Sequence, residues 1–309
     1  MCRLFGMSAG RARVSATFWL LDADDSLRRQ SHANPDGTGL GTFDEVGRPV
    51  VEKQPLAAWH DPAFASEARE RRSSTFVAHV RHSSGSDPTP ENTHPFELDG
   101  RVFAHNGVLE GLPELERHLG DAMSLVRGDT DSERLFALVT SETAAAGGDV
   151  GVGMERALGW VADHLPVYAV NLVLATPSDL WACRYPDTHA LWILDRRHPA
   201  AGLDHRSAAG TRVVSDELGD APSVVVASER LDDDPGWRML DPGVLVRVGP
   251  DLQVDERVVV DHDPVHRLQL SDLGAAAASQ RPTGARAGRE GRGVGHPGRW
   301  LSRRSSWPR

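Results

Sequence analysis

The chain has 309 residues, of which 39% are hydrophobic and 25% charged, a composition that indicates a folded globular protein rather than a disordered or fibrous one. The formal net charge is −10, and residues 275–309 contribute +7, so residues 1–274 carry −17. Such an acidic body argues against nucleic acid as the main partner, because phosphate binding needs a concentrated basic surface.

Apolar periodicity and composition predict the elements in chain order. The first are helices at 16–29 and 62–72, strands at 75–81 and 101–105, and helices at 131–143 and 152–165. Strands follow at 167–176, 180–184, 223–228 and 244–248. Two strand-rich halves with helices between and around them favour an α+β fold, in which sheets pack on each other under a cover of helices.

Two boundaries follow from the same patterns. No repeat or linker divides residues 2–274, so we predict a single domain there, with Met1 removed. Residues 275–309 mix Gly, Arg, Ser and Pro with almost no apolar periodicity, which predicts a disordered Arg/Gly-rich tail. The alternatives for this tail are a nucleic-acid-binding arm, with Trp300 and Trp307 as stacking groups, and a membrane tether.

Apolar runs in the sequence are too short for a membrane span. The run 167–175 has about half of the roughly 18 to 20 residues that a bilayer requires, and Asn171 interrupts it. Arg11 and Arg13 lie where the apolar part of a signal peptide would have to continue. We therefore predict no membrane partner and a cytoplasmic location.

Cys2 is the most informative residue for chemistry. A small residue at position 2 allows removal of the initiator Met, which leaves a cysteine at the new N-terminus. Its free α-amine titrates near pH 7.7 to 8.0, so it can accept the thiol proton, and nucleophile and base then belong to one residue. The alternative is that Cys2 is merely a small residue near a chain end. The second cysteine, Cys183, is predicted to be a buried core thiol.

Four polar segments supply further candidates, each with a structural alternative. Arg81 ends a strand and could grip a carboxylate through two hydrogen bonds, or form a surface ion pair. Asp131 could hold an ammonium group, or cap the helix that follows it. Asn106 and Gly107 could form an oxyanion hole, or a tight hairpin turn.

A metal site is not predicted. His79, His82, His94 and His105 show no recognised ligand spacing on a helix, and two of them fall in predicted core strands. The sequence also has no glycine-rich loop of the kind that holds a nucleotide, so we expect no cofactor.

The motifs together resemble the class II glutamine amidotransferases, which are N-terminal nucleophile hydrolases, and among them the stand-alone YafJ-like members. The resemblance rests on the start Met-Cys-Arg-Leu-Phe-Gly, a turn at 36–39, and the segments HVR, NTHPF, AHNG and DTDSE in family order. It implies an αββα four-layer sandwich with Cys2 as nucleophile, Asn106 and Gly107 around the oxyanion, and no cofactor. It also implies that Arg81, Asp131 and His94 bind the substrate.

The expected function is that of an amidohydrolase, which cleaves the γ-amide of L-glutamine or of another γ-glutamyl compound through a thioester. No second catalytic domain follows in the sequence, so two enzyme hypotheses stay open. Ammonia passes to a separate synthase subunit, or the protein cleaves a substituted γ-glutamyl compound outright, as the ergothioneine-pathway hydrolases of this superfamily do. The alternative of a different class is a catalytically idle regulatory or scaffold protein with the same fold.

Overall fold

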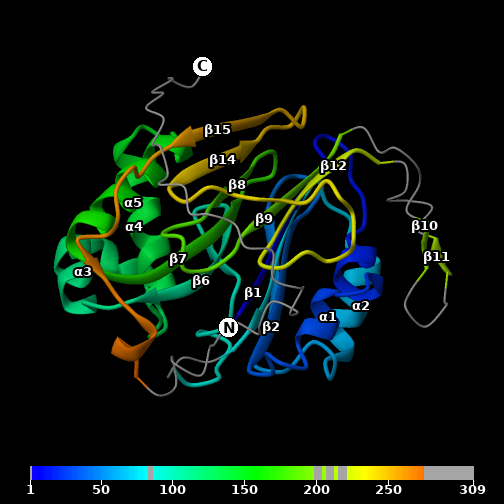
Figure 1. Cartoon of the computed structure of the whole chain (residues 1–309), viewed down its shortest axis with the longest axis horizontal. Helices are drawn as coiled ribbons and strands as arrows, with labels where there is room; N and C mark the ends of the chain where they lie inside the picture. The colour runs from blue at the N-terminus through cyan, green and yellow to red at the C-terminus, as the bar shows by residue number, and fades with distance from the viewer. Residues whose placement is uncertain (1, 83–85, 198–203, 207–211, 215–220, 275–309) are drawn as a thin grey trace, which may run out of the picture.

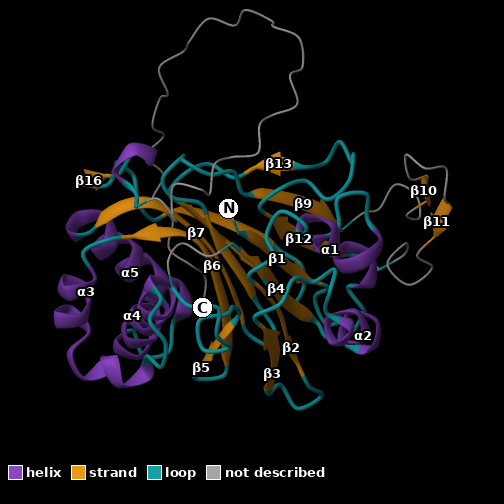
Figure 2. Cartoon of the chain, turned by 90° about the horizontal axis from the view of Figure 1, so that it is seen from below, coloured by secondary structure: helices purple, strands orange, loops and turns teal. Residues whose placement is uncertain are grey.

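The computed structural model describes residues 2–82, 86–197, 204–206, 212–214 and 221–274. Two large sheets lie face to face at its centre, and helices cover both outer faces (Figures 1 and 2). One outer layer holds α1 (Leu27–Gln30) and α2 (Pro62–Glu70), and the other holds α3 (Leu112–Leu119), α4 (Asp131–Ala145) and α5 (Val150–His164). The predicted α+β fold, an αββα sandwich, is confirmed.

The first sheet is antiparallel and has the strand order β13-β9-β12-β1-β4-β2-β3. Its strands are β1 (Arg3–Ser8), β2 (Gly37–Phe43), β3 (Pro49–Gln54), β4 (Thr75–Arg81), β9 (Trp192–Arg196), β12 (Ser223–Ala227) and β13 (Arg238–Met239). β1 is central and pairs with both β12 and β4. Cys2, which precedes β1, therefore lies at the end of a central strand.

The second sheet has the order β15-β14-β8-β7-β6-β5. Its strands are β5 (Phe96–Leu98), β6 (Arg101–Leu109), β7 (Pro166–Ala175), β8 (Leu180–Cys183), β14 (Val244–Val248) and β15 (Val254–Val258), and β16 (His266–Arg267) pairs in parallel with β7. The smaller elements are the π-helical turn η1 (Phe18–Asp22), the 3₁₀ turns η2 (Gly120–Leu125) and η3 (Leu270–Asp272), and the paired strands β10 (Asp204–Arg206) and β11 (Arg212–Val214).

Alternation of side chains along β1 explains how one strand serves two layers. Phe5 and Met7 belong to the core that the first sheet shares with η1 and α2, whereas Leu4 belongs to the core between the sheets. Gly6 faces the same way as Leu4, and a Cβ there would lie 2.7 Å from Cγ1 of Val173 in β7. The glycine therefore lets the two sheets approach each other closely at β1.

Glycines in β2 have a similar function, and they correct one prediction. The residues 36–39 do not form a turn, because β2 begins at Gly37. A Cβ at Gly39 would lie 2.3 Å from the carbonyl oxygen of His94, and one at Gly41 would lie 2.4 Å from Cγ1 of Val102. The glycines give room for the 92–96 segment to pack on the inner face of the sheet.

Most predicted elements are present, with two differences. The segment 16–29 is not one helix, because the chain is extended at Ala23, with ψ 154°, and the Ser26 hydroxyl donates to the Leu21 carbonyl at 3.1 Å. The strand predicted at 101–105 continues to Leu109 as β6. Asn106 and Gly107 therefore lie inside a strand, and the hairpin-turn alternative for this pair is wrong.

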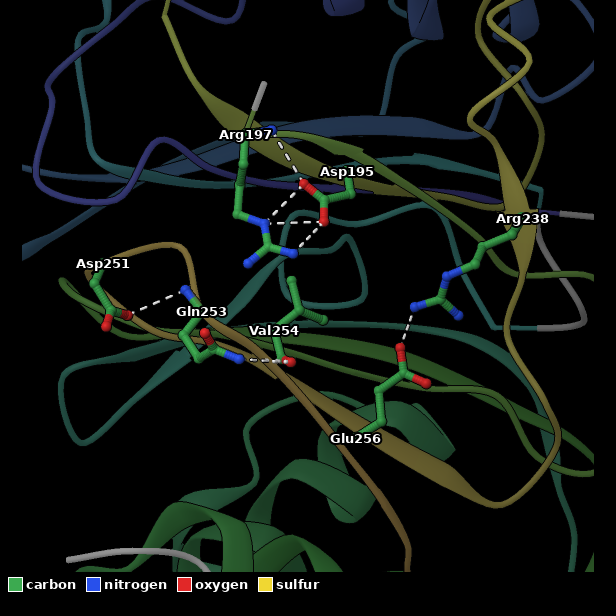
Figure 3. A network of polar contacts seen from close by, with 7 residues as sticks. All are labelled: Asp195, Arg197, Arg238, Asp251, Gln253, Val254 and Glu256. Carbon is green, nitrogen blue, oxygen red and sulfur yellow. Dashed lines mark hydrogen bonds and ion pairs between the residues drawn. The ribbon is translucent and has the colours of Figure 1, made fainter. Parts of the chain in front are cut away.

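One of two charged pairs at the outer edges of the sheets joins the first sheet to the second (Figure 3). Arg238 in β13 pairs with Glu256 in β15, which connects an edge of the first sheet to an edge of the second. Arg197 pairs with Asp195 at the end of β9 at 2.7 Å. All four side chains are at least one third exposed, so we expect these pairs to add little to the free energy of folding.

Within the described ranges, no helix is both long and apolar enough to cross a membrane. Residues 275–309 lie outside the described residues. The predicted disorder of this tail, its two alternatives and the domain boundary at 274 therefore stay predictions, as does the cytoplasmic location.

Candidate active site

Cys2 is buried at the end of β1, with 9% of its surface exposed. Its Sγ accepts from the backbone N–H of His82 at 3.2 Å and lies 3.3 Å from the carbonyl oxygen of the same residue, which places the sulfur beside the end of β4. Burial raises the pKa of the thiol, while the His82 N–H and the charges of Arg81 and Arg3 oppose that rise. The thiol therefore needs a base before it can act as a nucleophile at neutral pH.

Arg81 ends β4 next to Cys2, as the pairing of Arg3 with Val80 requires. Arg81 is 4% exposed, and its guanidinium donates to the carbonyls of Asp87, at 3.2 Å, and Ser86, at 3.0 Å. A second bond joins it to the Ser86 hydroxyl at 2.6 Å. These bonds fix the planar fork, so the surface-ion-pair alternative for Arg81 is wrong, and a buried cation lies beside the thiol.

Asn106 belongs to the facing sheet. β6 contacts β4 across the space between the sheets. His79 lies in that space, two residues before Arg81 on the same face of β4, and is completely buried. Asn106 follows His105 directly in β6 and is completely buried. Among the described residues, neither its Nδ2 nor its Oδ1 has a hydrogen-bond partner. Burial of an amide without hydrogen-bond partners costs free energy of folding. Such unpartnered groups are typical of sites that bind a ligand.

Gly107 offers a backbone N–H at the same place. It faces Val170 in β7, and both the N–H and the carbonyl of Val170 bond to the backbone of Tyr185, two residues after the end of β8. In an antiparallel ladder this makes Gly107 and Val170 a non-hydrogen-bonded pair, so the Gly107 N–H points to the other edge of β6. β5 pairs only with residues Arg101–Phe103 and does not reach that edge at Gly107. A side chain at 107 is excluded, since its Cβ would lie 1.8 Å from the Ala169 carbonyl oxygen.

Asp131 lies beside the same edge of β6, but it is not the helix cap. The N-cap of α4 is Thr130, whose hydroxyl accepts from the Glu133 N–H at 3.2 Å. Asp131 is the first helical residue. Its Oδ2 accepts from the Leu109 N–H at 2.8 Å, and its Oδ1 accepts from the Ser132 N–H at 2.8 Å. The capping alternative therefore named the wrong residue, and Asp131 joins α4 to the end of β6.

We expect Asp131→Asn to lower the free energy of unfolding by about 1 to 2 kcal/mol, because both carboxylate oxygens accept backbone N–H groups and an amide offers one acceptor only. Urea denaturation measures the loss. Asp129→Asn is the matched control, since Asp129 is exposed two residues earlier and should change stability by less than about 0.5 kcal/mol. Equal stability of the two variants would contradict this structural role.

His94 packs against His79 and Phe96, with ring centroids at 4.2 and 4.6 Å. It is 5% exposed, and burial holds its pKa well below the ordinary value, as burial also lowers the pKa of His79 to about 3. Both rings are therefore neutral at physiological pH. The described residues contain no group of three or more His, Cys, Asp or Glu side chains placed to hold a metal ion.

Sequence reasoning missed one polar residue of this region. Asn171 in β7 stands opposite Asn106 and is completely buried between the sheets. Its signal in the sequence is a single amide that interrupts the apolar run 167–175. Cys183 is completely buried, as predicted, and burial raises its pKa to about 12.

Comparison with known proteins identifies the family to which the chain belongs. The family described as glutamine amidotransferases class-II matches residues 1–264. The chain is 31% identical to the gamma-glutamyl-hercynylcysteine sulfoxide hydrolase of Mycobacterium tuberculosis H37Rv, over 80% of this chain and 93% of that protein. It is 30% identical to the putative glutamine amidotransferase YafJ of Escherichia coli K12, over 79% of this chain and 95% of that protein.

Solved structures share the fold. A glutamine aminotransferase class-II domain protein from Silicibacter pomeroyi aligns with a TM-score of 0.57 and 22% identity, over 85% of this chain and all of that one. The glutamine phosphoribosylpyrophosphate amidotransferase of Bacillus subtilis aligns with a TM-score of 0.60 and 18% identity, over 85% of this chain and half of that one. With the family match and the relatives above, these alignments establish that the chain is an enzyme of the class II glutamine amidotransferase family, with the N-terminal nucleophile hydrolase fold.

Proposed function

We propose that this enzyme cleaves the γ-amide bond of L-glutamine or of a substituted γ-glutamyl compound through a thioester on Cys2. The observation that carries the proposal is the position of the buried Cys2 thiol. It lies beside the fixed Arg81 guanidinium, at the end of the inter-sheet space where Asn106 keeps an unpartnered amide. Its relative from M. tuberculosis is named as a hydrolase of a γ-glutamyl compound, which supports the same substrate class.

The steps follow from the groups present. The α-amine of Cys2, freed by removal of Met1, takes the thiol proton, and the sulfur attacks the γ-carbonyl carbon. The oxyanion that forms accepts from Asn106 Nδ2 and the Gly107 N–H. The C–N bond breaks as the α-ammonium returns its proton to the departing amine. Water then adds to the thioester, the C–S bond breaks, and glutamate leaves with the proton back on sulfur.

Binding of the glutamyl head group is assigned to Arg81 and Asp131. Arg81 keeps donors for the α-carboxylate after its bonds to residues 86 and 87. Asp131, partly exposed at the edge of β6, offers its negative charge to the α-ammonium. His94 contributes a neutral ring to the inner wall next to His79.

The proposed function is tested with the purified protein and a panel of amides: L-glutamine, γ-glutamylmethylamide, γ-glutamylglycine and γ-glutamylcysteine. Glutamate release is measured for each, with the corresponding α-glutamyl dipeptides as controls. We expect release from one or more γ-glutamyl amides and none from the α-linked controls. A dominant preference for L-glutamine would favour ammonia supply to a separate synthase subunit. No release, together with no labelling of Cys2 by 6-diazo-5-oxo-L-norleucine, would favour the idle scaffold.

A protein that retains residues before Cys2, such as an uncleaved N-terminal tag, is expected to be inactive although its thiol is intact. The α-amine would then be part of an amide, and an amide nitrogen is not a base at neutral pH. Intact-mass analysis of the active protein should show a chain that begins at Cys2. A protease-cleavable tag gives the matched control, because cleavage directly before Cys2 should restore activity. Full activity before cleavage would contradict the proposed base.

A further inference from the structure

The segment between β8 and β9 crosses from the second sheet to the first at the Cys2 end of the sandwich. In the second sheet, Cys183 pairs with Leu172, so the chain leaves β8 level with Asn171 and Asn106. In the first sheet, Trp192 pairs with Ala227, which itself pairs with Phe5 of β1. The segment therefore enters β9 only three residues from the level of Cys2. Both registers place residues 184–191 beside the candidate site.

Two buried side chains hold the backbone of this segment. Asn171 Nδ2 donates to the carbonyls of His189, at 3.3 Å, and Ala190, at 3.0 Å. Arg184 Nε donates to the His189 carbonyl at 2.7 Å, and its Nη2 donates to the Asp187 carbonyl at 2.8 Å. The carbonyl of His189 thus accepts hydrogen bonds from two side chains, Asn171 in β7 and Arg184 at the start of the segment. Together they fix the backbone at His189.

The imidazole of His189 is buried but has unused hydrogen-bonding groups. It is 2% exposed, and neither Nδ1 nor Nε2 has a partner of good geometry among the described residues. Its ring meets Tyr168 edge-on, with centroids 5.2 Å apart. Burial lowers its pKa to about 4, helped by nearby positive charges that include Arg3 and Arg184, although the Thr188 carbonyl opposes the shift. At physiological pH the ring is neutral and offers one donor and one acceptor.

Strand order decides which part of a substrate would meet this ring. In the first sheet, β4 with Arg81 lies on one side of β1, and β12 followed by β9 lies on the other. In the second sheet, β5 lies on one side of β6, and β7 followed by β8 lies on the other. Since Arg81 is assigned to the glutamyl head group, the departing amine extends toward the 184–191 segment.

We propose that His189 is a specificity-determining residue that contacts the departing amine of the substrate, with Asn171 as the residue that positions it. The inference rests on the proposed function and deepens it. One donor and one acceptor match an amine portion that carries a polar group of its own, as in γ-glutamyl derivatives of amino acids. Ammonia released from L-glutamine has no such group, so this contact favours substituted γ-glutamyl amides as the substrate class.

The test compares His189→Met with His189→Gln. The two side chains are close in size, but only Gln keeps a donor and an acceptor. We expect His189→Met to lower kcat/KM for γ-glutamylglycine by about 10- to 100-fold and for L-glutamine by less than about threefold. His189→Gln should recover a large part of the loss. Labelling of Cys2 by 6-diazo-5-oxo-L-norleucine, which carries no departing amine, should proceed at the wild-type rate in both variants and fail in Arg81→Met.

Two results would overturn the assignment of His189. One is unchanged selectivity between γ-glutamylglycine and L-glutamine in both variants. The other is an equal fall in both activities and in the labelling rate, which a purely structural role predicts. Labelling and activity of the wild-type protein are measured first, because they test the proposed function separately from the role of His189. If it is neither labelled nor active on any γ-glutamyl amide, the proposed function fails and the role of His189 fails with it. If it is active, the variants decide His189 alone.

Discussion

Cys2→Ala is expected to reduce glutamate release by roughly 10,000-fold or more while the protein remains folded. The nucleophile is lost completely, and no other described group near the site can replace it, because Cys183 is buried in the core with a pKa raised to about 12. The thermal unfolding midpoint should change little, since among the described residues the sulfur forms hydrogen bonds with the His82 backbone alone. Steady-state kinetics and thermal melts on the same preparation measure both effects.

Cys2→Ser provides the stricter comparison, because it keeps a small polar group at the same place. Its alcohol has a much higher pKa than a thiol, so the α-amine cannot deprotonate it effectively. We expect it to be nearly as inactive as Cys2→Ala. Cys183→Ala is the control for loss of a thiol, and it should keep wild-type activity although it leaves a small cavity in the core. Substantial turnover by Cys2→Ala would remove Cys2 from the mechanism.

The parts of the site that were predictable from the sequence are those where polar residues end or interrupt an apolar strand. Arg81 closes the run 75–81, which the structure forms as β4 with the same bounds. Asn106 interrupts the apolar pattern of β6. A buried amide in a strand usually has hydrogen-bond partners, so an amide at such a position is a candidate for a functional residue. Arg81 lies next to Cys2 because β1 pairs with β4, whereas Asn106 lies in the facing sheet and depends on how the two sheets pack. No local pattern in the sequence specifies either the strand pairing or the packing of the sheets; only the family resemblance predicts them.

Other features depend on close approach and were not predictable from local patterns. Gly37 and Gly39 belong to the segment 36–39, which the sequence predicts as a turn, because glycine is usual where the chain reverses. In the structure they lie with Gly41 in β2, where the missing side chains admit the 92–96 segment and β6. His189 gave no signal either, since a single histidine in a connecting segment has no periodicity. Its position follows from the registers of β8 and β9, which the sequence does not reveal.

Asn106→Ala is expected to lower kcat by about 100- to 1,000-fold with a much smaller change in KM, because the amide would stabilise the oxyanion only as it forms. This variant separates catalysis from folding unusually well. Both amide atoms lack partners in the described structure, so their removal breaks no hydrogen bond and spares the cost of burying unsatisfied groups. We therefore expect the free energy of unfolding to fall only by the cost of the small cavity, about 1 kcal/mol.

Asn171→Ala is the matched control, since Asn171 is the same residue type, equally buried and directly opposite in β7. Its Nδ2 donates to two backbone carbonyls, so the variant should lose about 1 to 3 kcal/mol of stability. L-Glutamine is the substrate for the kcat comparison, because the contact that Asn171 positions through His189 is with a substituted departing amine. Urea denaturation and kcat measured on both proteins give the comparison. If Asn106→Ala keeps kcat within about threefold of the wild type, the oxyanion is stabilised by other groups, and the unpartnered amide of Asn106 needs another explanation.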